Sequence, residues 1–124
     1  MNYKLVIHGR LCGMNEFIKA DRSSPYEGAR MKREAETLIR YTIRQQLHGL
    51  HITKPVALRY AFYEPNRMRD LDNISGFAHK VIQDSLVKEK VLKDDGWNEI
   101  VGMEDTFYVD KKAPRIVVHI EEVE

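Results

Sequence analysis

The chain has almost no cysteine, and this scarcity excludes several classes of protein. Only Cys12 is present among 124 residues, so no internal disulfide can form and a disulfide-rich secreted scaffold is excluded. A single thiol fits a reducing compartment, and we expect the protein to act in the cytoplasm. No apolar run is long enough to cross a membrane, and the first residues lack the apolar region of a signal peptide. We therefore expect no membrane association.

The overall charge is nearly balanced, but its distribution along the chain is not. Residues 1–69 carry 13 Lys and Arg against 6 Asp and Glu, whereas residues 70–124 carry 7 against 13. Such a division permits a basic surface for a polyanion beside an acidic metal site. It is equally compatible with a fold that mixes the two halves. With 43% hydrophobic residues, the 124-residue chain fits a single domain with a real core.

Hydrophobic periodicity predicts the α+β class. We expect a strand, a long loop, a helix, a strand, a helix and two strands, over 3–8, 9–25, 29–47, 56–63, 72–90, 100–109 and 115–122. The order β-α-β-α-β-β predicts a single small domain, residues 1–124, in which two helices pack on one mixed sheet. The last two strands are separated by a short turn containing Pro114, which favours a hairpin.

Two acidic groups suggest where chemistry takes place. Asp70 and Asp72 are two residues apart, so in an extended segment both side chains would point to one side. A second pair, Asp94 and Asp95, follows the second predicted helix. Carboxylates from two segments are typical ligands of magnesium or manganese. The ordinary alternatives are a helix N-cap at Asp72 and a simple turn at Asp94-Asp95-Gly96.

Basic residues surround these carboxylates in the sequence. Arg67 and Arg69 stand just before Asp70, and arginine beside a metal site indicates a substrate that carries phosphate. Further candidates for phosphate contacts lie in the predicted loop and at the start of the first helix: Arg10, Lys19, Arg22, Lys32 and Arg33. Solvated surface positions would explain these residues equally well.

The second predicted helix carries a lysine on the side of the acidic site. At about 100° per residue, Lys80 and Asp84 fall in the same sector as Asn73. Lys80 would then reach over the aspartates with Asp84 as its partner. The alternative is an ordinary surface ion pair between the two. Trp97 is expected to pack in the interior rather than to stack on a base.

These residues, taken together, resemble a known family. Arg69-Asp70-Leu71-Asp72-Asn73, then Lys80-x-x-x-Asp84-x-Leu86, then Lys93-Asp94-Asp95 and an Ile-Val strand are similar to the RusA-type Holliday junction resolvases of prophages and bacteria. The resemblance covers nearly the whole chain in element order and is specific across residues 67–101. Residues 9–15 are weakly similar to the family's N-terminal loop.

The resemblance implies a homodimeric endodeoxyribonuclease for DNA recombination and repair. Such an enzyme binds branched DNA and hydrolyses one phosphodiester in each of two opposed strands of a four-way junction, with Mg²⁺ or Mn²⁺. Carried onto this chain, the metal ligands are Asp70, Asp72 and Asp95, with Asp94 as the alternative to Asp95. Arg69 is the basic residue ahead of the aspartates, and Lys80 the catalytic lysine.

Two features depart from the family pattern. Gly76 occupies the position where the usual spacing places the lysine, and two extra residues follow Asp95. A non-catalytic or degenerate DNA-binding module and a nuclease for other branched DNA remain as alternative functions. The intact aspartates favour an enzyme over the module, because clustered carboxylates do not help a protein that only binds phosphate.

Overall fold

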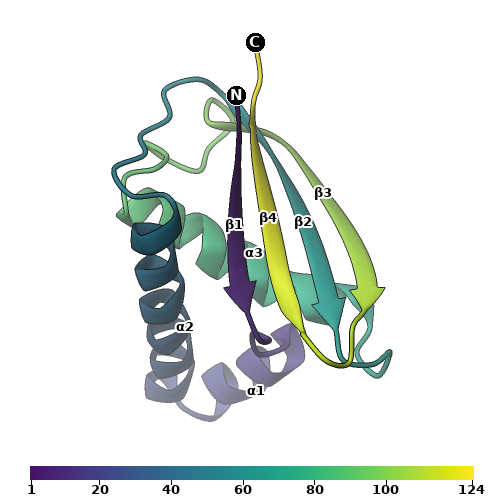
Figure 1. Cartoon of the computed structure of the whole chain (residues 1–124). Helices are drawn as coiled ribbons and strands as arrows, with labels where there is room; N and C mark the ends of the chain where they lie inside the picture. The colour runs from purple at the N-terminus through teal and green to yellow at the C-terminus, as the bar shows by residue number, and fades with distance from the viewer.

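The computed structural model describes all of residues 1–124 and contains four strands and three helices. In chain order these are β1 (Asn2–His8), α1 (Met14–Ser23), α2 (Pro25–Gln46), β2 (Val56–Glu64), α3 (Leu71–Lys88), β3 (Ile100–Val109) and β4 (Arg115–Glu122). All helices lie on one side of a single mixed sheet (Figure 1). The predicted α+β class and single mixed sheet are confirmed, and the strand bounds of β3 and β4 match the prediction. No helix of the chain is both long and apolar enough to span a bilayer.

The segment predicted as one long loop contains a helix, so the expected count of two helices is wrong. Helix α1 begins after Gly13 and ends before Ser24, and α2 begins at Pro25, four residues earlier than predicted. Ser24 caps α2 through a hydrogen bond from the backbone N–H of Tyr26 to its hydroxyl, at 3.2 Å. Helix α1 has no fully buried residue, which explains why its apolar pattern is weak.

The strand order is β1-β4-β2-β3, which overturns the predicted hairpin. Strand β2 lies between β3 and β4, parallel to β3 and antiparallel to β4. Burial explains the order. Strand β4 buries Ile116, Val118 and Ile120, whereas β3 has no buried residue and carries Glu104 and Asp105. The more apolar strand therefore occupies the centre of the sheet, and the charged strand lies at its edge.

The core fills the space between the sheet and helices α2 and α3. Strand β2 buries alternate residues as the sequence predicts, with Tyr60 and Phe62 each 1% exposed. Phe77 of α3 is fully buried. The opposite face of the sheet carries no helix (Figure 1). This packing fixes both ends of α3 relative to the sheet, and so positions the acidic residues that flank this helix.

Candidate functional site

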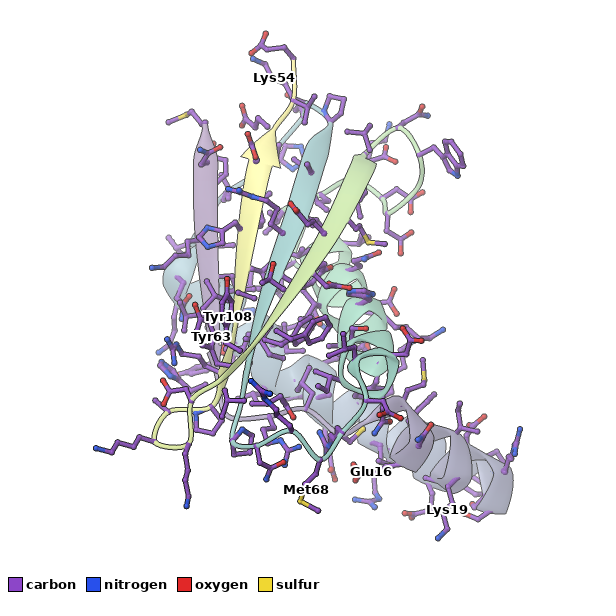
Figure 2. All side chains as sticks on the ribbon, turned by 90° about the vertical axis from the view of Figure 1, so that its right-hand side faces the viewer. Glu16, Lys19, Lys54, Tyr63, Met68 and Tyr108 are labelled. Carbon is purple, nitrogen blue, oxygen red and sulfur yellow. The ribbon has the colours of Figure 1, made fainter.

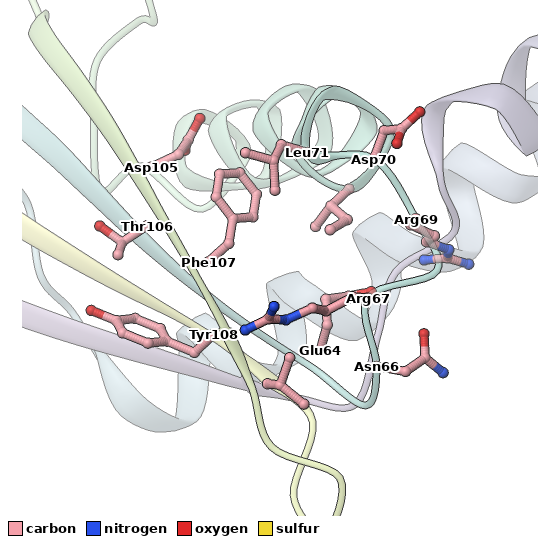
Figure 3. Close-up of a pocket in the computed structure, with 12 residues that line it drawn as sticks. Glu64, Asn66, Arg67, Arg69, Asp70, Leu71, Asp105, Thr106, Phe107 and Tyr108 are labelled. Atoms are coloured by element: carbon pink, nitrogen blue, oxygen red, sulfur yellow. The ribbon is translucent and has the colours of Figure 1, made fainter.

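A cleft of about 580 Å³ opens where β2 ends and α3 begins. Residues from the connecting segment, the first turns of α3 and the end of β3 form its walls (Figure 3). They are Glu64, Asn66, Arg67, Arg69, Asp70, Leu71, Ile74, Asp105, Thr106, Phe107, Tyr108 and Val109. Three of the residues predicted from sequence therefore lie together here, namely Arg67, Arg69 and Asp70.

The carboxylate of Asp70 is exposed and makes no bond within the chain. Asp70 is the N-cap of α3, with extended backbone angles, yet its side chain makes no capping hydrogen bond. The first-turn amides of a helix and its dipole favour a negative charge at this end. Asp70 thus leaves its carboxylate exposed at the rim of the cleft instead of using it for a cap.

Asp72 does not accompany Asp70 into the cleft. The expectation of one shared direction assumed extended backbone, but Asp72 lies in the first turn of α3. Residues two apart on a helix point in different directions, so Asp72 is exposed outside the walls of the cleft. The alternative of an N-cap at Asp72 is also wrong, because the cap position belongs to Asp70.

Asp94 and Asp95 lie at the other end of α3. The 18 residues of the helix span about 27 Å, at 1.5 Å for each residue. Asp95 lines a separate hollow of about 370 Å³ with Gln83 and Trp97. The local structure is a turn, in which the Asp94 carboxylate accepts a hydrogen bond from the Asp95 backbone N–H at 2.8 Å. No three Asp, Glu, His or Cys side chains of one chain come together in a metal-binding group.

Of the two arginines in the cleft, only Arg67 is free to bind a ligand. Arg69 donates to the carbonyl of Leu11 at 3.0 Å and to Glu16 at 2.6 Å, and its side chain is 19% exposed. It therefore ties the segment before α3 to α1. Arg67 is exposed and forms no ion pair, so its charge is available to a phosphate.

The other residues predicted to contact phosphate also fall into two groups, those held in ion pairs and those without one. Arg10 pairs with the buried Glu64 at 2.8 Å, and Lys32 pairs with Asp84 at 3.0 Å. The hydrogen bond with Asp84 raises the pKa of Lys32, so this ammonium group stays charged. Lys19 and Arg22 of α1 are exposed and form no ion pair. Figure 2 shows Lys19 at the same end of the molecule as Met68, which adjoins the cleft segment.

Lys80 is exposed on α3, but Asp84 is not its partner. Because Lys32 of α2 takes that carboxylate, Lys80 has no ion pair and is not among the residues that line the cleft. Gly76, one turn earlier, faces α1: a Cβ atom there would lie 3.0 Å from the terminal methyl of Met14. A lysine at position 76 would collide with α1, so on this helix Lys80 is the available cation.

The structure adds two acidic residues that the sequence patterns did not single out, Glu64, which is paired with Arg10, and Asp105. Asp105 of β3 lines the cleft, and its Oδ1 lies 2.7 Å from Nε2 of His79. The imidazole packs against Tyr60, with ring centroids 4.6 Å apart. The signal was available, because alternation along β3 places Asp105 on one face with Val101, Met103 and Phe107. A carboxylate on an otherwise apolar face of a strand indicates a hydrogen-bond partner or a function.

Trp97 contradicts its predicted role, since its side chain is 95% exposed. It lies in the turn before β3, beyond the reach of the core, and borders the hollow that contains Asp95.

Comparison with known proteins gives no family assignment: no protein-family model matches the chain, and no curated protein matches it in sequence.

Proposed function

We propose that this chain is a metal-dependent endodeoxyribonuclease that cleaves branched DNA, with the four-way junction as its substrate. The observation that carries the proposal is the pairing of free groups in one cleft. Asp70 presents a carboxylate without an internal bond, and Arg67 presents a guanidinium without an ion pair. One group suits a hard cation and the other a phosphate oxygen. The resemblance of residues 67–101 to RusA-type resolvases supports the same reaction.

The donor set fits magnesium in type, although one chain supplies only part of it. Mg²⁺ commonly takes one or two carboxylates and completes its shell with water and substrate phosphate oxygens. Asp70 would hold it, with Asp95 as the second ligand. When bound, the ion would lower the pKa of a water and neutralise charge on the phosphate. Arg67 would bind non-bridging oxygens in the cleft, and Lys80, Lys19 and Arg22 would contact the DNA backbone outside it.

The distance between Asp70 and Asp95 makes a homodimer part of the proposal. Within one chain, the length of α3 keeps the two carboxylates apart. Two chains related by a two-fold axis and running antiparallel along α3 would bring Asp95 of one chain to Asp70 of the other. The dimer would then carry two equivalent sites, which suits paired cuts in a symmetric junction.

One experiment tests the activity. A synthetic four-way junction, a linear duplex and a flap are incubated with the protein in Mg²⁺, Mn²⁺ or EDTA. We expect metal-dependent paired nicks in the junction, lost in Asp70→Asn and retained in Asp84→Asn, which makes the same chemical change outside the cleft. Equal cutting of all substrates would remove the junction specificity. Binding without cleavage in either metal would contradict the enzyme.

A mixing experiment tests whether the site is shared between chains. Asp70→Asn and Asp95→Asn are each expected to be inactive. A mixed dimer of the two variants contains one site with both carboxylates intact if each site draws on both chains. Cleavage should therefore return when the variants are mixed, as single nicks in place of paired ones. No recovery on mixing, with exchange of subunits shown independently, would mean that Asp70 and Asp95 do not share a site across the dimer.

A second function is favoured by the same separation of the carboxylates. If Asp95 never reaches Asp70, the chain is a non-catalytic DNA-binding module, and its free cations Arg67, Lys19 and Arg22 bind phosphates alone. Binding would then depend on salt but not on Mg²⁺. Titrations of junction DNA with and without Mg²⁺, at constant ionic strength, distinguish the two functions.

A further inference from the structure

The two edge strands of the sheet, β1 and β3, differ in how their outward backbone groups are covered. At the β1 edge, the side-chain amide of Gln46 pairs with the backbone of Val6. Val6 N–H donates to Gln46 Oε1 at 2.7 Å, and Gln46 Nε2 donates to the Val6 carbonyl at 2.8 Å. The amide occupies the outward N–H and C=O of Val6 as a neighbouring strand would, so the middle of this edge is covered against another chain.

The β3 edge has no such cover. Strand β3 is 10 residues long and pairs only with β2, so alternate N–H and C=O groups along its other side face solvent. Figure 1 shows β3 at the outer margin of the sheet, opposite β1. A register shift leaves Val101 as an extra residue near the start of β3, but Gly102 to Val109 pair with β2 in regular register. A long edge without cover is a template for adding a strand.

Exposed apolar side chains gather along this edge. Val101, Met103 and Val109 of β3 are 54%, 54% and 51% exposed, and Trp97 just before the strand is 95% exposed. Together with Tyr108, which is 47% exposed, they lie within residues 97–109, whereas the remaining exposed large apolar residues belong to other parts of the chain. Charges that would protect the edge from pairing are confined to Glu104 and Asp105 at its middle.

The charges on either side of β3 indicate what pairs with it. Residues 93–99 carry Lys93 against Asp94, Asp95 and Glu99, a net charge of −2, and residues 110–114 carry Asp110 against Lys111 and Lys112, a net charge of +1. Two copies of β3 placed antiparallel would set the acidic start of each strand against the basic end of the other. A two-fold axis produces this arrangement, because an antiparallel pair of identical strands is self-complementary.

We propose that β3 of one chain pairs antiparallel with β3 of a second copy, which joins the two sheets into one of eight strands. This inference deepens the proposed function, since it names the surface of the proposed dimer. It also sets the direction of the second chain. The Asp95 end of one β3 lies beside the cleft end of the other, where Asp105 and Val109 line the cavity.

Cross-linking tests the pairing directly. Residues near the two-fold axis face their own copies at about 4.5–5.5 Å between Cα atoms, within the reach of a disulfide. In a Cys12→Ser background we expect Glu104→Cys or Thr106→Cys, at the middle of β3, to give a covalent dimer on mild oxidation. The control is Lys4→Cys, on the β1 edge. Cross-linking of the Lys4 variant alone would overturn the proposal.

The native thiol is a minor complication. Burial raises the pKa of Cys12 to about 11, so it stays protonated and reacts slowly at neutral pH.

Light scattering after size exclusion provides the second readout. We expect a species of twice the 14.5 kDa chain mass at micromolar concentration. Val101→Lys places a lysine on the β3 edge and should weaken dimerisation at least about tenfold, because each chain then carries an unmatched charge into the interface. Leu38→Lys, at a residue of similar exposure on α2, should leave it unchanged.

The outcomes separate this inference from the proposed nuclease. A monomer under all conditions, or a dimer insensitive to Val101→Lys, would overturn the pairing of β3, whether or not DNA is cut. A dimer that cross-links through residue 104 or 106 but cleaves no DNA would retain the interface and remove the nuclease.

Discussion

The side-chain oxygen of Asn73 accepts a hydrogen bond from the backbone N–H of Asn15, at 2.8 Å. This bond joins the first turn of α3 to the first turn of α1, beside the candidate cleft. Gly13 makes the approach possible, because a Cβ atom at that position would lie 2.7 Å from the same oxygen. The two helices therefore meet through a glycine and an asparagine whose sizes are matched.

The contact predicts a strong coupling between the two residues. Asn73→Ala should lower the free energy of unfolding by about 1 kcal/mol, the usual net value of one hydrogen bond. Gly13→Ala should cost about 1–3 kcal/mol, because its methyl group collides with Asn73. In the double variant the collision is relieved, so the loss should be less than the two combined. Urea unfolding of all four proteins measures the coupling, and additive losses would contradict the matched fit.

The two arginines of the cleft should respond differently to substitution. Arg67→Ala removes an exposed, unpaired charge, so we expect stability to change by less than about 0.5 kcal/mol. Its junction affinity should fall, and the dependence of log affinity on log salt should lose about one phosphate contact. Arg69→Ala removes two hydrogen bonds and should cost about 1–2 kcal/mol of stability. Thermal unfolding together with salt-dependent binding separates the roles, and identical profiles would contradict them.

Regular alternation made most of the strands predictable from the sequence. The local pattern does not show which strands pair with one another in the sheet. Strands β3 and β4 have their predicted bounds because each is a run with β-branched residues between polar turns. The predicted pairing of β3 with β4 is wrong, because β2, which is distant in sequence, is the better partner for both strands. Helix α1 was missed because it packs with partly buried residues such as Phe17, whose ring centroid lies 4.9 Å from that of Phe77 with the planes tilted by 41°.

The candidate site was predictable in composition but not in geometry. The segment around Asp70 does form a cleft with its arginines, as the residue types suggested. Which of these residues remain free depends on the fold. Glu16 of the unexpected helix forms an ion pair with Arg69, and Lys32 forms one with Asp84. Asp72 changed direction because the helix begins one residue earlier than predicted. Each of these outcomes is set by a residue distant in sequence, which local patterns do not reveal.

A cluster at the far end of α3 predicts an acid-sensitive contribution to stability. Glu89 accepts hydrogen bonds from Arg44 at 2.7 Å and Arg40 at 2.6 Å, and its side chain is 10% exposed. The hydrogen bond from Arg44, the largest cause, and then that from Arg40 hold the pKa of Glu89 below its ordinary value. The carboxylate therefore stabilises the fold above the pKa of an unfolded glutamate. This stability is lost as pH falls through the lowered pKa.

Glu89→Gln measures this contribution. At pH 7 we expect the variant to be less stable than the parent by about 1–2 kcal/mol, a range that allows for the solvent exposure of Arg44. The difference should shrink as pH falls below about 4, because the parent carboxylate then becomes protonated. Unfolding curves across pH 3–7 test the prediction. A difference that is constant with pH would assign the effect to packing instead of charge.

Asp105 and His79 predict a role for β3 within the proposed reaction. The imidazole holds one oxygen of Asp105, at 2.7 Å, and the residue still lines the cleft that contains Asp70. Asp105 thus offers a further carboxylate, beside Asp70 and the proposed Asp95, whose orientation is fixed. We expect Asp105→Asn to lower the rate of junction cleavage at least about tenfold, equivalent to 1.4 kcal/mol in the barrier. Glu121→Gln, on β4 and away from both the cleft and the β3 edge, should cleave at the parent rate.

Substitutions of His79 test separately whether this residue positions Asp105. His79→Gln keeps a donor near Asp105, whereas His79→Phe removes it, so the glutamine variant should retain more activity than the phenylalanine variant. Junction affinity should be unchanged in both, because neither alters a free cation. Single-turnover cleavage and binding assays separate rate from affinity. Equal loss of rate in both variants, with unchanged unfolding curves, would mean that His79 supports the fold of the cleft rather than the orientation of Asp105.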